Sequence, residues 1–593
     1  MKNIIKFAVL IFLFTSCDDL FEPALENNRE LDAMYGEPSY AQGVLANAYI
    51  LLPYSSTPNS DLATDDAVTN DIANNYLRMA TGSWSAENDP TSQWQGRRNA
   101  IQYINLFLQN ADSVVWSNDK AIRAIYNDRI KGEAYGLRAL HMYYLLMAHA
   151  GWTNGGELLG VPIITDPETK DSDFNLPRNT FQQCVDQILA DAEKAIELLP
   201  LDYNDVSDSE IPAKYVAMGV TQASNYNRAN GKHIRGRISG RIVEAVRAQV
   251  ALLAASPSYS SGSTVSWEDA ANHAASVLDR IGGPAGLAGK GGVWYVKSEV
   301  DNLESGTTPA EIIWRSDIGQ SNSLEGDNFP PEQDGKGRVN PTQNLVDAFP
   351  ALNGYPITDP ASNYDPANPY ENRDPRLANY IVVNGSKQGP NSAVVITGAY
   401  GNNKDAINRE SGRSTRTGYY LRKLLRSDCN PNSQYNTQQK HYTARIRYTE
   451  IFLAYAEAAN EAWGPTGTGG NSYSAYDVIK AIRQRAGIGI SNNDAYLESV
   501  KGDTEKMREL IRNERRLELC FENKRFWDLR RWDVNLTTLN ETAAGMKIES
   551  SGGNLIYNRI DVESRNYKDY MYHGPIPYNE IQKWSNLEQN AGW

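Results

Sequence analysis

The segment 504–532, TEKMRELIRNERRLELCFENKRFWDLRRW, constrains the fold of this chain more than any other stretch. Its first part carries apolar residues at helical spacing, which predicts a helix with one buried face. The residues on that face are Met507, Leu510, Ile511, Leu517 and Phe521. Where the helix is expected to end, apolar area is added by Phe526, Trp527, Leu529 and Trp532. The fold must therefore bury one face of a strongly charged helix.

Three carboxylates follow one another four residues apart on this helix: Glu514, Glu518 and Glu522. At this spacing they stack in one column, and like charges in a column repel unless cations lie close by. The candidate cations are Arg515, Arg516, Arg525, Arg530 and Arg531. We expect a partly buried Glu/Arg lattice that stabilises the fold. The alternative is that two of the carboxylates are the acid and base of a glycoside hydrolase.

The composition excludes one class of partner and favours one kind of ligand. The 593 residues carry a net charge of −14, which argues against nucleic acid, because phosphate groups attract Lys and Arg. The 34 Tyr and 12 Trp combine flat apolar faces with polar groups, which suits wet, polar ligands. Four cysteines in a chain of this length do not make a disulfide scaffold.

The amino terminus has the pattern of a lipoprotein signal peptide. Lys2 and Lys6 begin an apolar run that is too short to span a bilayer as a helix. The run ends in FTSC at 14–17, which resembles a lipobox with Cys17 as the lipidated residue. We expect residues 1–16 to be a signal peptide and a palmitate-type lipid on Cys17 to anchor an otherwise soluble protein. The alternative is an ordinary signal peptide with a chance cysteine.

Helical patterns occupy both ends of the remaining chain. After a polar tether at 17–37, residues 38–281 show paired helices that resemble tetratricopeptide repeats without a clean period. Residues 282–445 are rich in Gly, Pro, Asn and Asp, and a loop region of this length in a compact protein is usually functional. Helix returns in 446–593. We predict a mostly α fold, an imperfect tetratricopeptide-like helical-repeat scaffold with a long loop-rich, mixed region that carries the ligand site. The alternative is a set of unrelated packed helices.

Six short motifs lie one after another between residue 372 and the last residue of the chain. They are NRDPRL (372–377), GYYLRK (418–423), IRYTEIFLAYAEA (446–458), ERRLELCFENKRFWDLRRW (514–532), HGPIPYNEI (573–581) and LEQNAGW (587–593). In order and spacing they resemble the SusD/RagB family, the surface glycan-binding lipoproteins of Bacteroidota. The resemblance implies that the 514–532 motif is structural. It also implies a lipid anchor in the outer membrane at the cell surface and a SusC-like TonB-dependent transporter as partner.

A site for sugars needs an aromatic platform for the apolar ring face and polar groups for the hydroxyls. The loop from Asp61 to Trp84 offers both, and we expect Trp84 to be the platform. The candidates in this loop are Asp61, Asp65, Asp66, Asn70, Tyr76 and Trp84. The candidates in the middle region are Phe329, Arg338, Arg373 and Tyr400. The alternative places the acids in solvated turns and Trp84 in the core beside a helix.

No motif points to a cofactor. The six His are scattered without paired metal spacing, no G-x-S-x-G occurs, and Gly289-Lys290 does not complete a phosphate-binding loop. We therefore expect no metal, no cofactor and no enzymatic activity. The favoured hypothesis is a lipoprotein that captures oligosaccharides and delivers them to the transporter. The alternatives are a surface glycoside hydrolase that uses paired Glu residues and a RagB-like peptide-binding lid.

Overall fold

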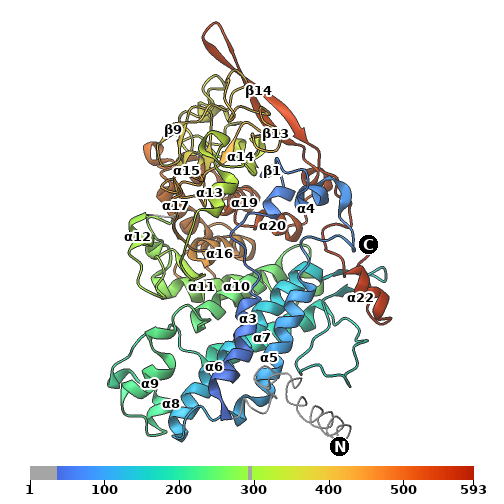
Figure 1. The fold of residues 1–593 in the computed structure, drawn as a ribbon, viewed down its shortest axis with the longest axis vertical. Coiled ribbons are helices and arrows are strands. Elements are labelled where there is room, and N and C mark those ends of the chain that lie inside the picture. The colour runs from blue at the N-terminus through green and yellow to red at the C-terminus, as the bar shows by residue number, and fades with distance from the viewer. Residues whose placement is uncertain (1–35, 292–296) are drawn as a thin grey trace, which may run out of the picture.

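The computed structural model describes residues 36–291 and 297–593. The expected signal peptide at 1–16, Cys17 and nearly all of the tether at 17–37 lie outside the described residues. Within them the chain is mostly helical, with small two-stranded antiparallel sheets (Figure 1). The predicted mostly α fold is confirmed.

The longer helices pack one against the next from the bottom of the molecule to its middle (Figure 1). α3 packs on α5, α5 on α6, α6 on α7, α7 on α10, α10 on α11 and α11 on α16. Their bounds are α3 Pro38–Ile50, α5 Trp94–Asn110, α6 Lys120–His149, α7 Phe181–Leu198, α10 Gly240–Ala255, α11 Trp267–Leu278 and α16 Tyr448–Trp463. The largest apolar core lies between them. Each helix pair buries its faces only against its neighbours, as in a repeat protein.

Two glycines on α6 allow the segments that follow it to pack close to its backbone. A Cβ added at Gly132 would lie 2.7 Å from Leu199 Cγ, and one at Gly136 would lie 2.8 Å from Val243 Cγ2. A larger residue at either position would force the following helices away from α6. These two glycines therefore set the distance between α6 and the segments that pack on it.

The middle region is built from short elements, and its small sheets join segments that are far apart in the chain. β1 pairs with β6, β4 with β12, β5 with β11 and β7 with β10. β4 and β7 lie within the apolar segments EIIWRS (311–316) and YIVVNG (380–385). The bounds are β1 Ala67–Thr69, α12 Lys297–Asp301, β4 Ile312–Arg315, β5 Gly319–Ser321, α13 Ser323–Asn328, β6 Val339–Pro341, α14 Gln343–Ala348, α15 Pro375–Tyr380, β7 Ile381–Val382, β10 Tyr420–Leu421, β11 Gln439–His441 and β12 Ala444–Arg447.

The helix predicted from residue 504 is shorter than its apolar pattern. α19 spans Thr504–Leu519, and Phe521 adopts a left-handed backbone with φ 63° before α20 (Arg525–Arg531) begins. Glu522 therefore leaves the column that the spacing predicted.

The remaining elements are β2 Gly151–Trp152, β3 Leu158–Leu159, β8 Lys387–Gln388, β9 Ala393–Val394, β13 Ala543–Ser551, β14 Asn554–Glu563, α4 Asn75–Arg78, α8 Ala213–Val216, α9 Ala223–Asn230, α17 Ala475–Ala486, α18 Ala495–Val500, α21 Leu536–Leu539 and α22 Tyr578–Lys583.

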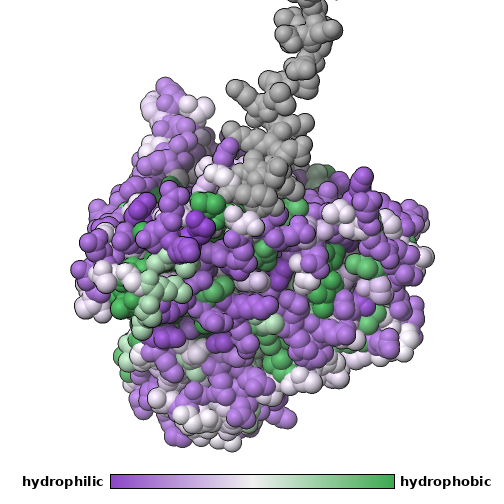
Figure 2. Space-filling view, turned by 90° about the horizontal axis from the view of Figure 1, so that it is seen from below, coloured by the Kyte–Doolittle hydropathy of each residue, from purple (hydrophilic) through white to green (hydrophobic). Residues whose placement is uncertain are grey.

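The surface seen from below is mostly hydrophilic, with hydrophobic residues in scattered small areas (Figure 2). Among the helices of the described ranges, none has the length and apolar character needed to cross a bilayer.

Candidate functional site

Glu514 and Glu518 on α19 are fully buried, each with 0% of its surface exposed. The Arg376 guanidinium lies 2.9 Å from Glu514 Oε2 and 3.0 Å from Glu518 Oε1. Arg483 pairs with Glu514 at 2.8 Å, and Arg485 pairs with Glu518 at 2.9 Å. The interpretation of the column as a structural Glu/Arg lattice is confirmed for these two residues.

Glu522 lies beyond the end of α19 but belongs to the same network. Its carboxylate pairs with Lys423 Nζ at 2.6 Å and with Arg447 Nε at 2.9 Å. The Lys423 ammonium also donates to the backbone carbonyls of Glu518 and Cys520, at 2.8 and 2.9 Å. A cation at this position satisfies carbonyl groups that the end of a helix leaves without partners.

The cations that neutralise the column come from other motifs. Arg376, Lys423 and Arg447 belong to NRDPRL, GYYLRK and IRYTEIF. The arginines predicted for this role pair elsewhere: Arg515 contacts Asp528 at 2.9 Å, and Arg531 contacts Glu457 at 2.6 Å. The expected partners are thus corrected, because the lattice is closed by residues distant in sequence.

The electrostatics of Glu518 do not fit an acid or base. Burial alone would raise its pKa, but the guanidinium groups of Arg485 and Arg376 lead the charges that outweigh burial and lower the pKa to about 2. A carboxyl group that stays ionised has no proton to donate, and buried oxygens cannot reach a glycosidic bond. The hydrolase alternative finds no support at Glu514 and Glu518.

The acids of the early loop form a second ion cluster. Asp65 lies 2.8 Å from both Arg525 and Arg516, and Asp66 lies 2.6 Å from Arg516. Both acids are buried. This corrects the expectation of open side chains, because Arg516 on α19 and Arg525 on α20 draw the loop inward.

Asp61 is also buried, with 0% of its surface exposed. Its Oδ2 accepts a hydrogen bond from the backbone N–H of Asn523 at 2.8 Å, and its Oδ1 is buried without a hydrogen bond among the described residues. Burial, reinforced by the charge of Asp66, raises the pKa of Asp61 to about 8. The group is therefore protonated at neutral pH.

Four further candidates support the backbone or the core. Asn70 donates to the Gly337 carbonyl at 2.8 Å and accepts from Arg338 Nη1 at 3.2 Å. Arg373 is buried and donates to three backbone carbonyls. Phe329 has 0% of its surface exposed. The structure thus brings Asn70 and Arg338 together, but in a contact that holds two loops against each other.

Trp84 is a core residue with 4% of its surface exposed. Its ring centroid lies 4.9 Å from that of Trp593 and 5.8 Å from that of Phe526, and the Arg530 guanidinium lies 5.2 Å from it. Its Nε1 donates to Asp89 at 3.0 Å. These neighbours cover the ring, which corrects the expectation of an open stacking platform.

Tyr400 and Tyr76 differ from the other candidates. Tyr400 is 41% exposed, and its hydroxyl accepts from Asn384 Nδ2 at 3.0 Å. Tyr76 is half-buried, its hydroxyl donates to the Pro90 carbonyl at 2.9 Å, and it lines a cavity. That cavity is the place where aromatic and polar groups converge.

The cavity measures about 190 Å³ and lies between the helical scaffold and the segment 521–531. Its half-buried aromatic residues are Tyr54, Tyr76, Tyr143, Tyr144 and Trp527. Its polar residues include Ser55, Ser56, Asn59, Gln93, Gln249, Arg445, Glu450 and Lys524. Aromatic faces with a few convergent polar groups are typical of a site for a small polar ligand.

The tyrosines of the cavity hold one another in place. The rings of Tyr54 and Tyr144 meet edge to face at 5.6 Å, as do those of Tyr143 and Tyr144 at 5.2 Å. Burial raises the pKa of Tyr143 and of Tyr144. Both hydroxyls therefore stay protonated at neutral pH, and each can donate one hydrogen bond and accept another.

The polar residues that line the cavity include both positively and negatively charged side chains. Lys524 Nζ donates to Glu450 Oε1 at 2.7 Å, and Gln249 Nε2 donates to the same oxygen at 2.8 Å. The Arg445 guanidinium lies 4.6 Å from the centroid of the Trp314 ring. A ligand in the cavity thus meets donors and acceptors whose positions are already fixed.

The turn after α19 positions one side of the cavity. Asn523 has a left-handed backbone with φ 59°, a conformation that Asn tolerates better than most residues. Its Oδ1 accepts from the Ser60 backbone at 3.0 Å, and its Nδ2 donates to the Thr57 carbonyl at 2.9 Å. These bonds fasten the loop that contains Tyr54 and Ser55.

Sequence reasoning missed most of the cavity residues. Tyr143 and Tyr144 lie within the helical pattern of 38–281, and Trp527 is one of the apolar residues expected where the helix from residue 504 ends, so neither pattern marks them as site residues. One signal was present, because neighbouring residues on a helix point about 100° apart, so two adjacent tyrosines cannot share one core face. Nothing local indicates that Tyr54 and Trp527 meet them.

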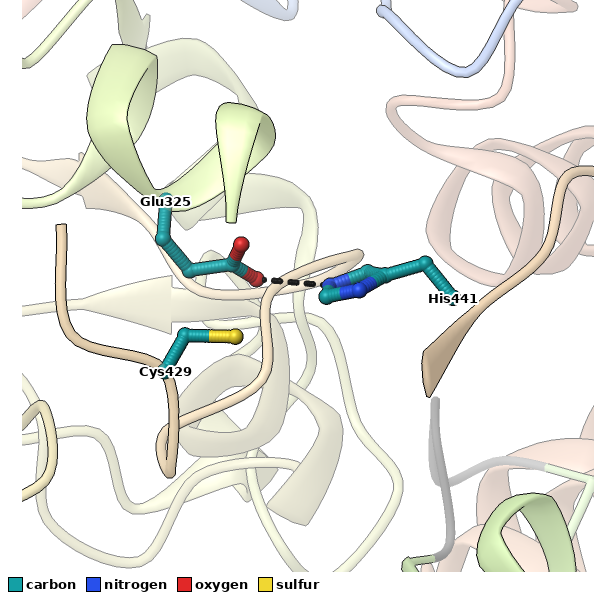
Figure 3. Close-up of side chains that lie close together, drawn as sticks. All are labelled: Glu325, Cys429 and His441. Atoms are coloured by element: carbon teal, nitrogen blue, oxygen red, sulfur yellow. Dashed lines mark hydrogen bonds and ion pairs between the residues drawn. The ribbon is translucent and has the colours of Figure 1, made fainter. Parts of the chain in front are cut away.

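A second group of chemically reactive side chains lies beside the cavity (Figure 3). A carboxylate oxygen of Glu325, the sulfur of Cys429 and a ring nitrogen of His441 lie within 4.8 Å of one another. The sequence analysis expected no metal site. A local motif could not reveal this group, since Glu325 and His441 are 116 residues apart.

The arrangement of a helical scaffold under a loop-rich region defines a class of known structures. A SusD-like protein from Bacteroides fragilis aligns with a TM-score of 0.71 and 23% identity, over 96% of this chain and 100% of that one. A SusD-like carbohydrate binding protein from the same species aligns at 0.67 and 21%, over 94% and 100%. Surface glycan-binding protein A from Bacteroides fluxus aligns at 0.55 and 18%, over 94% and 100%. At these identities the likeness establishes the fold.

Family models identify the chain more closely. The SusD family model matches residues 297–593, and a model described as starch-binding associating with outer membrane matches residues 28–220. The first match covers half of the chain, so the chain belongs to the SusD family, as its motifs indicated. SusD-like protein P2 from Formosa agariphila is 30% identical over 145 residues. That match spans 24% of this chain and 24% of that protein.

Proposed function

We propose that this protein is a cell-surface lipoprotein that binds oligosaccharides in the cavity between the helical scaffold and the segment 521–531, without cleaving them. The observation that carries the proposal is the convergence of half-buried aromatic rings and fixed hydrogen-bonding groups on one cavity. Two solved relatives have names that describe carbohydrate or glycan binding, and one family model is described as starch-binding.

The chemistry of the wall matches that of a sugar. Trp527 and Tyr144 can cover the apolar CH face of a pyranose ring. The hydroxyl groups of the sugar can pair with Asn59, Lys524 and Glu450, which line the same cavity. Of the residues predicted from the sequence, Tyr76 is the one retained here.

The anchor and the partner complete the proposal. Cys17 carries the lipid, the protein sits on the outer membrane at the cell surface, and it delivers its ligand to a SusC-like TonB-dependent transporter. The lipobox-like FTSC at 14–17 and the family membership support this part.

Calorimetry with a panel of plant, microbial and host oligosaccharides tests the proposal, with product analysis after long incubation. We expect saturable binding of at least one glycan class and no shortening of the bound chain. Shortening of that chain would make the protein a hydrolase. Binding of peptides with no sugar bound would favour the RagB-like peptide lid.

Replacement of Cys17 tests the anchor. Cys17→Ala should move the protein out of the membrane fraction and abolish labelling with palmitate. Cys184→Ala is the control, because Cys184 is buried in the scaffold and should keep both properties. A Cys17→Ala protein that stays in the membrane and still labels would contradict the assignment.

A further inference from the structure

Glu325, Cys429 and His441 converge from α13, from the loop that follows residue 424 and from the end of β11 (Figure 3). Glu325 and Cys429 are 0% exposed, and His441 is 8% exposed. Carboxylate oxygen, thiolate sulfur and imidazole nitrogen are the three kinds of ligand atom that zinc uses in proteins. Their convergence out of bulk water calls for an explanation in terms of a bound group or a paired charge.

The hydrogen bonds of His441 show which ring nitrogen carries the proton. Nδ1 lies 2.9 Å from the carbonyl oxygen of Gln439. Because a carbonyl only accepts, Nδ1 carries the proton, and in a neutral ring Nε2 then holds a lone pair. That lone pair faces Glu325 Oε1 at 2.9 Å, so a cation is needed between them, either a proton or a metal ion. A backbone carbonyl on the far nitrogen is the common support of a metal-bound histidine.

The two oxygens of the Glu325 carboxylate differ in their partners. Oε1 accepts from the backbone N–H of Arg426 at 2.7 Å. Oε2 is buried and accepts no N–H or O–H from the described residues. The Cys429 thiol, a weak donor, is the hydrogen-bonding group beside this carboxylate. A metal ion would replace that weak bond with direct coordination, whereas the proton on His441 would serve Oε1 alone.

The charges around the group leave room for a divalent ion. The guanidinium of Arg426, whose backbone N–H bonds Glu325, is already paired with Asp301 and Asp428 at 2.9 Å each. A carboxylate and a thiolate supply two negative charges, and a neutral His441 supplies none. One divalent cation would therefore make the buried group electrically neutral.

We propose that Glu325, Cys429 and His441 bind a divalent transition metal ion, with Zn²⁺ the best match to this mixed O, S, N set. Binding would release the thiol proton of Cys429 to solvent and leave a fourth position for water. Leu324, which precedes Glu325 in the sequence, and Tyr442, which follows His441, line the cavity. The ion would thus tie together the segments that form one wall of that cavity. This proposal does not depend on what the cavity binds.

The test uses full-length protein purified in detergent, stripped with EDTA and titrated with Zn²⁺ against a chromophoric chelator. We expect one Zn²⁺ per chain with a Kd of about 1 µM or tighter. Loading with Co²⁺ should give a near-ultraviolet thiolate-to-cobalt band. Zn²⁺ should also raise the thermal midpoint of the wild type.

Cys429→Ser and His441→Gln should each weaken Zn²⁺ binding at least tenfold, and Cys429→Ser should lose the cobalt band. The matched controls are Cys184→Ser, at a buried thiol elsewhere, and His233→Gln, at an exposed imidazole. Both controls should bind like the wild type. Absence of stoichiometric Zn²⁺ from the folded wild type would overturn the proposal in favour of a His441–Glu325 ion pair. So would equal binding by the wild type and Cys429→Ser.

Discussion

Polar side chains are buried and paired in the Glu/Arg lattice around α19, whereas those of the cavity next to it remain partly exposed. In the lattice, Glu514 and Glu518 are fully buried, and each meets arginines at hydrogen-bonding distance. In the cavity, Lys524 and Tyr144 are only half-buried and lie beside aromatic faces. Similar residue types therefore stabilise the fold in one region and present a surface to a ligand in the other.

The difference follows from solvation. A charge taken out of water must be compensated by a partner, so every lattice residue depends on the others. A half-buried group keeps part of its hydration and can exchange it for a ligand. We therefore expect substitutions in the lattice to change stability and substitutions in the cavity to change affinity.

The largest effect is expected at Glu518. Glu518→Ala leaves the buried guanidinium groups of Arg376 and Arg485 short of a partner and should lower the free energy of unfolding by about 3 to 5 kcal/mol. Urea denaturation measures it. The control is Glu549→Ala, because Glu549 pairs with Lys547 through side chains that are 47% and 44% exposed, and its loss should change stability by less than about 0.5 kcal/mol. Equal stability of both variants would show that the lattice contributes little.

Replacing Trp84, like replacing a lattice residue, should lower stability and leave affinity unchanged. Trp84→Ala removes a ring packed against Phe526 and Trp593 and should cost about 3 kcal/mol of unfolding free energy. The affinity of the remaining folded protein for its glycan should stay within about twofold of the wild type. A large loss of affinity at unchanged stability would restore the role first predicted for this residue.

Replacing Trp527 should instead lower the affinity for the glycan. Trp527→Ala removes an aromatic face from the cavity and should weaken glycan binding by about 2 kcal/mol, or about thirtyfold in Kd. Tyr400→Ala provides the control, since Tyr400 is exposed and lies outside the cavity lining. Calorimetry that finds the reverse order would move the site to the middle-region surface.

Asp61 offers an effect that depends on pH. Its folded pKa of about 8 lies above the unfolded value of about 3.9, so the folded state holds a proton that the unfolded chain releases between these values. The stability that this proton contributes is present at low pH and is lost as pH rises. Asp61→Asn is always neutral, so relative to the wild type it should gain about 3 kcal/mol of unfolding free energy between pH 5 and pH 8. A constant difference across this range would contradict the pKa.

The sequence predicted what is local. Apolar spacing predicted the paired helices within 38–281 and the helix that begins at residue 504, because a helical face repeats within one segment. It predicted that the Glu column is structural, since unpaired charges at that spacing repel. It did not identify Arg376 as the partner or Trp593 as the neighbour of Trp84. Those contacts join residues that are far apart in the chain, and no periodicity reports them.

The same limit applies to the candidate site. The loop at 61–84 has the composition of a sugar site, but its acids meet Arg516 and Arg525, which a local reading assigned to the Glu column. The cavity instead combines residues from three distant segments, represented by Tyr54, Tyr144 and Trp527. Only the fold brings them together.

The central claim is that a glycan occupies this cavity, and a crystal structure of the protein with its tightest-binding oligosaccharide tests it most directly. We predict an intact sugar with one ring face against Trp527 or Tyr144 and its hydroxyls hydrogen-bonded to residues such as Lys524 and Asn59. A sugar bound elsewhere, for example beside Tyr400, with the cavity filled only by water, would contradict the account.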